Sequence, residues 1–69
     1  MVMLHIQTER EDDGRWLAEV PAWPGVMSYG VTNAEARTKV TALALRVIAE
    51  RVESGEALPN ELAGMFQLA

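Results

Sequence analysis

The chain has 69 residues, a formal net charge of −4 at pH 7, one histidine and no cysteine. A chain of this length forms one domain without disulfides, and a single histidine disfavours a structural zinc site. The negative charge disfavours a free-standing nucleic-acid binder, which needs a basic face. Because so small a core supplies only roughly 3–5 kcal/mol of net stability, we expect the protein to self-associate.

The first twenty residues predict two strands joined by a turn. Apolar and polar residues alternate over 2–7, with Thr8 as an extension, and a period of two is typical of a strand with one buried face. The polar run 9–14 ends in Asp-Gly, which is typical of a hairpin turn. Residues 15–20 alternate again and predict the second strand. One face of this strand carries Trp16, Ala18 and Val20, and the other carries Arg15, Leu17 and Glu19.

The Pro-Ala-Trp-Pro-Gly segment at 21–25 predicts a rigid turn, because proline fixes φ and glycine accepts positive φ. Trp23 in this turn has two interpretations: an exposed anchor for a partner, or a side chain folded back over the sheet. Residues 26–31 predict a third strand. Its two faces carry Val26, Ser28 and Gly30, and Met27, Tyr29 and Val31. Glycine within a strand indicates the close approach of another backbone.

A long helix is predicted from Asn33 to about Glu53. Thr32 is a suitable N-cap, and Glu35 follows three residues later, as in a capping box. Gly55 suits the left-handed position just after a helix. The predicted apolar face comprises Ala36, Val40, Leu43, Ala44, Val47 and Ile48, widened by Thr41, Leu45 and Val52.

The segment after the helix allows two interpretations. The residue before Pro59 is disfavoured in a helix, and residues 61–63 predict a helical turn. Residues 65–68 are either a fourth short strand or a frayed tail, and we prefer the strand because their apolar side chains need cover. The predicted fold is therefore α+β in the order β-β-β-α-β, an antiparallel sheet with one long helix packed on one face, as a single domain over residues 1–69.

The sequence predicts neither a membrane span nor a secreted protein. No stretch approaches the ~20 apolar residues of a transmembrane helix. The first residues lack the basic region that precedes the apolar run of a signal peptide. Together with the lack of cysteine, these features lead us to expect a cytoplasmic protein.

The residues do not predict an active site or a cofactor. His5 is the only histidine, and no nucleophile-elbow motif surrounds Ser28. The acidic run consists of Glu9, Glu11, Asp12 and Asp13. These carboxylates lie in one turn, whereas two-metal nucleases collect carboxylates from separated parts of the chain. The run is therefore either a solvated turn or an acidic patch that meets a basic partner.

A block of residues at fixed spacing resembles the HicB family of small antitoxins. The block consists of Asp13-Gly14, Trp16, Ala18-Glu19-Val20-Pro21, Pro24-Gly25-Val26, Tyr29-Gly30, Thr32 and Glu35-Ala36, and it continues with Ala42-Leu43-Ala44-Leu45, Ile48-Ala49-Glu50-Arg51, Gly55-Glu56 and Pro59. The resemblance covers about residues 1–60. The combination is more specific than any one of its pieces.

The resemblance implies a β-β-β-α-β domain, described as a partial ribonuclease H fold, that is not a nuclease. The implied partner is a HicA-type toxin, a small basic ribonuclease that cleaves messenger RNA with a histidine and that the antitoxin binds and inhibits. Family members commonly form dimers or tetramers, and full-length members usually carry a C-terminal DNA-binding segment. Only ten residues follow Pro59, so we expect no C-terminal DNA-binding domain and no direct contact with nucleic acid.

We therefore expect an antitoxin module without catalytic residues or cofactor. Its candidate contacts with a basic partner are Glu11, Asp12, Asp13 and Trp23. Two alternatives stay open: an orphan domain of a lost toxin–antitoxin pair that only self-associates, and a residual nuclease that uses carboxylates. We also expect a homodimer or higher homo-oligomer, formed through an edge strand, because sheet edges need cover, or through the apolar margin of the helix.

Overall fold

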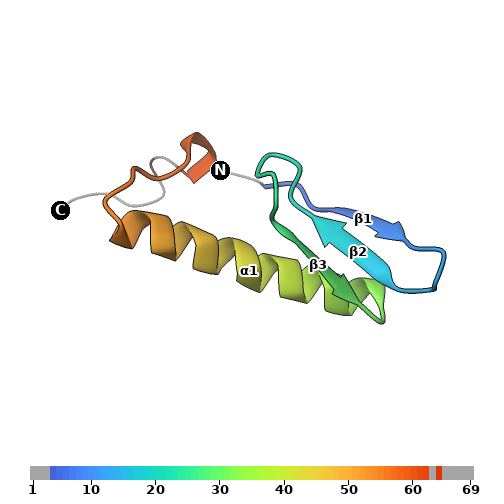
Figure 1. Cartoon of the computed structure of the whole chain (residues 1–69). Helices are drawn as coiled ribbons and strands as arrows, with labels where there is room; N and C mark the ends of the chain where they lie inside the picture. The colour runs from blue at the N-terminus through green and yellow to red at the C-terminus, as the bar shows by residue number, and fades with distance from the viewer. Residues whose placement is uncertain (1–3, 63, 65–69) are drawn as a thin grey trace.

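The computed structural model describes residues 4–62 and 64, and it shows a three-stranded antiparallel sheet with one long helix packed on one face (Figure 1). The elements are, in chain order, β1 (Gln7–Arg10), β2 (Trp16–Glu19), β3 (Met27–Gly30), α1 (Asn33–Glu53) and the 3-10 helix η1 (Asn60–Leu62). The sheet order is β1-β2-β3. The predicted α+β class is confirmed, and the predicted fourth strand over 65–68 lies outside the described residues.

The first strand begins later than predicted. The prediction covered 2–7; its part before residue 4 lies outside the described residues, and residues 4–6 have no regular structure. The backbone N–H of Glu11 donates to the carbonyl of Arg15 (2.7 Å) and closes a short turn directly after β1. Because the turn sets the register of its hairpin, residues 9–10 pair with β2, although the sequence placed them in the turn.

The second and third strands lie where they were predicted and keep the predicted faces. Leu17 pairs with Tyr29, and Ala18 pairs with Ser28. Side chains alternate between the two faces of a sheet. The helix-facing side chain of Ala18 is fully buried, whereas that of Tyr29, on the opposite face, is exposed.

The helix α1 begins and ends at the predicted caps. The backbone N–H of Glu35 donates to Oγ1 of Thr32 (3.0 Å), so Thr32 caps the helix. Oε1 of Glu35 accepts from the N–H of Val31 (3.3 Å). In a capping box it would accept from the N–H of the N-cap residue itself, which is Thr32. At the other end Gly55, at φ 88°, donates its N–H to the carbonyl of Val52 (3.0 Å), as in a Schellman motif.

The core lies between the sheet and α1. Its buried members are Ala18, Val20, Trp23, Val26, Ala36, Val40, Ala44 and Leu62. Trp23 is 6% exposed, so the second of its two interpretations is the one observed: the side chain folds back into the core. Gly30 lets β3 approach α1 closely, because a Cβ built there would lie 2.5 Å from the backbone nitrogen of Ala36.

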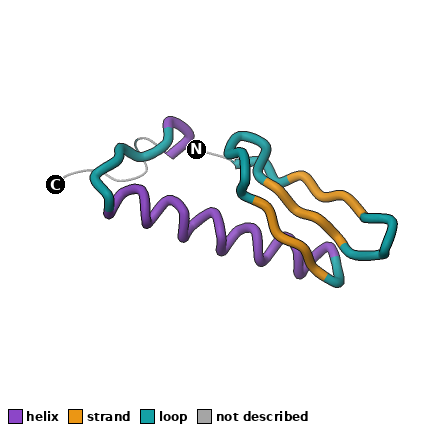
Figure 2. Tube along the Cα trace, in the orientation of Figure 1, coloured by secondary structure: helices purple, strands orange, loops and turns teal. Residues whose placement is uncertain are grey.

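The helix is longer than the sheet that it covers. It has 21 residues, whereas each strand has four; at about 1.5 Å and 3.3 Å per residue, their lengths are roughly 31 Å and 13 Å. Figure 2 shows the C-terminal half of α1 extending past the strands, where the segment before η1 turns back. The helix packs mainly on β3 and β2 and least on β1. In the described part of the chain, no helix combines the length and the apolar character that crossing a bilayer requires.

Candidate partner-binding face

The four predicted contact residues do not form one surface. Glu11, Asp12 and Asp13 lie in the turn between β1 and β2, whereas Trp23 lies in the turn between β2 and β3, at the opposite end of β2. Asp12 and Asp13 are exposed and Glu11 is half-buried. Trp23 is buried in the core and offers little surface to a partner. The structure therefore separates the acidic turn from the tryptophan.

Asp13 holds the side chain of Arg15 in place. Its Oδ1 accepts from the backbone N–H of Arg15 (3.0 Å), and its Oδ2 accepts from Nε (2.7 Å). These bonds, the backbone one first, lower the pKa of Asp13 below its ordinary value of 3.8. The Arg15 guanidinium lies 4.4 Å from the centre of the Tyr29 ring, a cation–π contact. Of the three turn carboxylates, Asp13 thus already has a cation beside it.

The sheet face opposite α1 collects side chains from all three strands. We call it the outer face, and it consists of Gln7, Glu9, Arg15, Leu17, Glu19, Met27 and Tyr29. The register forms one row from Glu9 through Leu17 to Tyr29. Met27 and Tyr29 are 42% and 41% exposed. Carboxylates on β1 and β2 therefore lie beside exposed apolar and aromatic side chains on β3.

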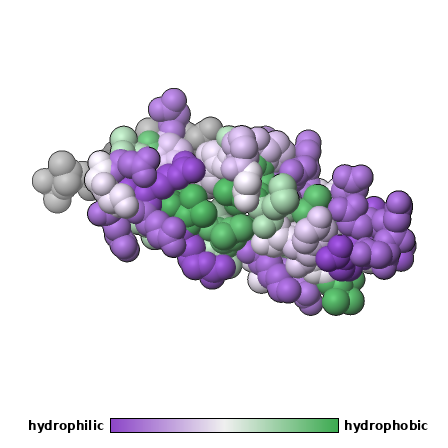
Figure 3. Space-filling model, in the orientation of Figure 1, coloured by the Kyte–Doolittle hydropathy of each residue, from purple (hydrophilic) through white to green (hydrophobic). Residues whose placement is uncertain are grey.

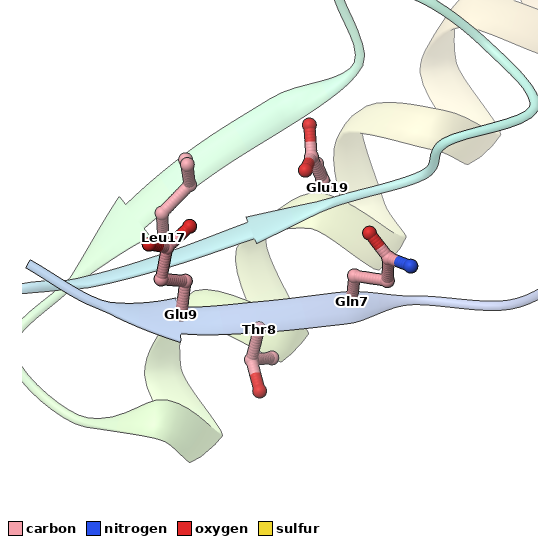
Figure 4. Close-up of a pocket in the computed structure, with 5 residues that line it drawn as sticks. All are labelled: Gln7, Thr8, Glu9, Leu17 and Glu19. Atoms are coloured by element: carbon pink, nitrogen blue, oxygen red, sulfur yellow. The ribbon is translucent and has the colours of Figure 1, made fainter.

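A shallow groove of about 300 Å³ crosses the β1–β2 part of this face. It is lined by Gln7, Thr8, Glu9, Leu17 and Glu19. Figure 4 shows four of these side chains projecting from one side of the sheet and Thr8 projecting from the other, toward α1. Two carboxylates around the apolar side chain of Leu17 suit a lysine or arginine, whose stem is apolar and whose head is cationic.

A second groove lies on the other side of the sheet, between the chain that leads into β1 and the helix. We call it the β1–α1 groove. Its volume is about 570 Å³, and it is lined by Ile6, Ala34, Arg37, Thr38, Thr41, Ala42 and Leu45. Leu45 is 61% exposed and Ile6 37% exposed. Figure 3 shows hydrophobic surface beside the helix, whereas the end of the molecule with the β1–β2 turn is mostly hydrophilic.

Within the described residues, the polar side chains considered for chemistry lie in separate parts of the fold. His5 is exposed ahead of β1, and Ser28 lies on the helix-facing side of β3. Within residues 4–62 and 64, no three His, Asp or Glu side chains are placed together to hold a metal ion.

The sequence predicted which residues of β2 share a face and which residues of β3 share a face, but it did not predict that these residues form one surface. The alternation placed Leu17 and Glu19 on one face of β2, and Met27 and Tyr29 on one face of β3. Only the strand register brings the two pairs together. Glu9 was missed because the sequence placed it in the turn, whereas it lies in β1 opposite Leu17.

No family model, no curated protein and no solved structure matches the chain.

Proposed function

We propose that this protein is a HicB-like antitoxin module that binds and inhibits a basic HicA-type ribonuclease. The observation that carries the proposal is the outer face, a sheet surface that no described element covers and on which carboxylates lie beside exposed apolar and aromatic side chains. The resemblance of residues 13–36 and of the following helix to HicB antitoxins supplies the family. Fold and face are compatible with a protein that acts by binding.

The charge of the sheet favours a basic partner. Residues 7–30 contain five carboxylates and two arginines, hence a net charge of −3 out of the chain's −4. Opposite charge on two proteins accelerates their encounter and sets their orientation. Leu17, Met27 and Tyr29 would form the desolvated centre of the contact, where apolar and aromatic anchors contribute most of the binding free energy.

Inhibition by such a face needs no chemistry. A ribonuclease binds RNA through a basic surface that replaces the counterions of the phosphates. An acidic protein bound to that surface excludes the RNA from it. The proposed place of action is the cytoplasm, because a toxin that cleaves messenger RNA has to be neutralised where messenger RNA is translated.

The test is co-expression with a basic HicA-like toxin, scored by growth rescue and by co-purification of the complex. We expect Glu9→Lys and Glu19→Lys each to weaken binding about tenfold, equivalent to roughly 1.4 kcal/mol. Glu53→Lys is the matched control, because it makes the same charge change at the exposed end of α1, where a cation is favourable.

The possible outcomes distinguish an error in the proposed binding surface from an error in the proposed antitoxin function. If the Glu9 and Glu19 variants bind as well as the Glu53 variant, the toxin does not contact the outer face. If the unmodified protein neither rescues growth nor co-purifies with the toxin, the antitoxin proposal is wrong for that pair, as an orphan domain would require. Metal-dependent RNA cleavage by the purified protein, lost in an Asp12→Ala, Asp13→Ala variant, would instead support the nuclease alternative.

A further inference from the structure

The side chain of Arg15 has neighbours of two kinds on the outer face. Leu17 pairs with Glu9 on β1 and with Tyr29 on β3. Arg15 lies two residues before Leu17 on the same face, so Glu9 and Tyr29 are its diagonal neighbours, one on each side. Diagonal neighbours of an antiparallel pair are about 7–8 Å apart, which a long side chain can span. Arg15 can therefore turn toward the carboxylate of β1 or toward the aromatic ring of β3.

The side of β1 offers Arg15 two carboxylates. The N–H of Glu11 donates to the carbonyl of Arg15 (2.7 Å), so Glu11 lies directly across from Arg15 and Glu9 lies diagonally. Attraction between opposite charges by itself would draw the guanidinium to this side. The structure shows the other arrangement. The guanidinium lies 4.4 Å from the centre of the Tyr29 ring, and Asp13 is the only described carboxylate within salt-bridge distance of it.

Asp13 accounts for this choice. Its Oδ1 accepts from the backbone N–H of Arg15 (3.0 Å), and its Oδ2 accepts from Nε of the same residue (2.7 Å). The first bond ties the carboxylate to the backbone, so the second bond fixes the direction in which the Arg15 side chain leaves the strand. The planar guanidinium then lies on the Tyr29 ring. Among the described residues, Glu9 forms no salt bridge.

We propose that Asp13 is a positioning residue of the outer face and not a contact residue: it holds Arg15 on Tyr29 and thereby leaves Glu9 available to a cationic side chain of the partner. The inference rests on the proposed binding of a basic partner by this face. An arginine turned toward β1 would neutralise Glu9 and repel the incoming cation. The sequence counted Asp13 among the partner contacts, and its bonds to Arg15 give it this different role.

The exposure of the pair separates this role from a structural one. The side chains of Arg15 and Asp13 are 55% and 53% exposed. An ion pair this exposed adds little to the stability of a fold. Replacement of Asp13 should therefore change where Arg15 lies and how the face binds, while the domain stays folded.

The first measurement is made without the toxin, on Asp13→Asn. Asparagine keeps one oxygen that can accept from the backbone N–H, but it loses the charge and the second acceptor. In the unmodified protein, the Tyr29 ring should shift the NMR signals of the Arg15 δ protons upfield, and these protons should show nuclear Overhauser contacts to the ring. In Asp13→Asn both signatures should disappear, and contacts from Arg15 to the side chain of Glu9 or Glu11 should replace them.

Asp12→Asn is the matched control. It removes the same charge from the neighbouring exposed residue of the same turn, and it leaves the bonds between Asp13 and Arg15 in place. Its Arg15 signals should match those of the unmodified protein. Unchanged circular dichroism spectra check that both variants are folded.

The second measurement is the affinity for a purified basic HicA-like toxin. Asp12→Asn should weaken binding about twofold, through net charge alone, and Asp13→Asn about fivefold. Arg15→Gln added to Asp13→Asn should bring the affinity back to within about twofold of the unmodified protein, because no arginine is left to neutralise Glu9. Added to Asp12→Asn, where Asp13 already holds Arg15, the same change should alter the affinity by less than about twofold. A contact role or a pure charge effect predicts the same gain in both backgrounds.

Failure of this inference and failure of the proposed function give different results. If the toxin binds but Asp13→Asn and Asp12→Asn weaken binding equally, or if Arg15→Gln does not restore it, Asp13 is not a positioning residue and the antitoxin function stands. If the toxin does not bind the unmodified protein, the function fails, and the NMR measurement decides the role of Asp13. Arg15 signals in Asp13→Asn that still report the Tyr29 ring would overturn the inference in either case.

Discussion

The two faces of the sheet differ in chemistry although they share the same short strands. On the inner face, Ala18, Val20 and Val26 are buried against α1, and no polar or charged side chain is buried among the described residues. On the outer face, Glu19 and Met27 are opposed and no described element covers them. Successive side chains of a strand point to opposite faces. A substitution at an even-numbered strand residue, on the inner face, should therefore affect folding, and one at an odd-numbered strand residue, on the outer face, should affect binding.

Trp23→Ala should have the largest effect on folding, because this loop residue contributes to the inner-face core. Trp23 is 6% exposed, and truncation of a buried tryptophan costs about 3–5 kcal/mol. The whole domain has only roughly 3–5 kcal/mol to lose, so the variant should be largely unfolded in water. Urea titration followed by circular dichroism measures this.

Met27→Ala on the outer face is the matched control for Trp23→Ala. Its side chain is 42% exposed, so its loss of stability should stay near 0.5 kcal/mol, about the usual limit for surface changes. A Trp23→Ala variant that unfolds like the unmodified protein but binds the toxin more weakly would contradict the core role of Trp23 and make it a recognition residue.

Gly30→Ala should be next in size. A Cβ at Gly30 would lie 2.5 Å from the backbone nitrogen of Ala36 and 3.0 Å from its Cα. Backbone atoms cannot turn away as a side chain can, so α1 has to shift, at a cost of about 1–3 kcal/mol. Ser28→Ala, on the same face of the same strand, should change the free energy of unfolding by no more than about 0.5 kcal/mol. Equal unfolding midpoints for the two variants would show that the contact between β3 and α1 accommodates a Cβ at residue 30.

Thr32→Ala tests the N-cap of α1, the helix that covers the inner face and leaves the outer face free. Loss of the bond from the Glu35 N–H to Oγ1 of Thr32 should cost about 1 kcal/mol. Thr32→Ser should restore most of it. Thr41→Ala is the control, because Thr41 is exposed within the helix, where alanine is the better helix former. A thermal melt in which Thr41→Ala loses more stability than Thr32→Ala would contradict the capping role.

The smallest expected effect is a dependence of stability on pH. The pKa of Glu35 is lowered from 4.5 by the hydrogen bond from Lys39 and then by the N–H of Val31, and the pKa of Asp13 is lowered from 3.8 by Arg15. A lowered folded-state pKa means that the stabilisation is complete above the ordinary pKa and is lost as the pH falls through the lowered value. The urea midpoint should therefore decline below about pH 4.5, and only slightly, because exposed charges are screened.

Glu35→Gln and Asp13→Asn should each flatten this decline. Glu35 contributes on the helix side and Asp13 on the side of the outer face, so the two variants divide the pH dependence between the two regions. The measurement is the urea midpoint of each variant between about pH 6 and about pH 3. A decline as steep in the double variant as in the unmodified protein would show that other groups cause it.

The elements whose signals are local could be predicted from the sequence alone. The helix runs over Asn33–Glu53 as predicted, because Thr32 and Gly55 form cap hydrogen bonds with residues only a few positions away. The faces of β2 and β3 were also predicted correctly, because alternation along a strand needs no knowledge of its neighbours.

Tertiary contacts set the start of β1, the position of Trp23 and the set of side chains that share the outer face. The start of β1 depends on the hairpin register: β1 spans Gln7–Arg10, whereas residues 4–6, which were predicted to be strand, have no regular structure. Trp23 is buried because α1 and the sheet supply a core for it. Glu9 lies beside Leu17, and Leu17 beside Tyr29, only through strand pairing. Each of these outcomes depends on contacts between residues distant in the chain, and neither capping signals nor alternation encode such contacts.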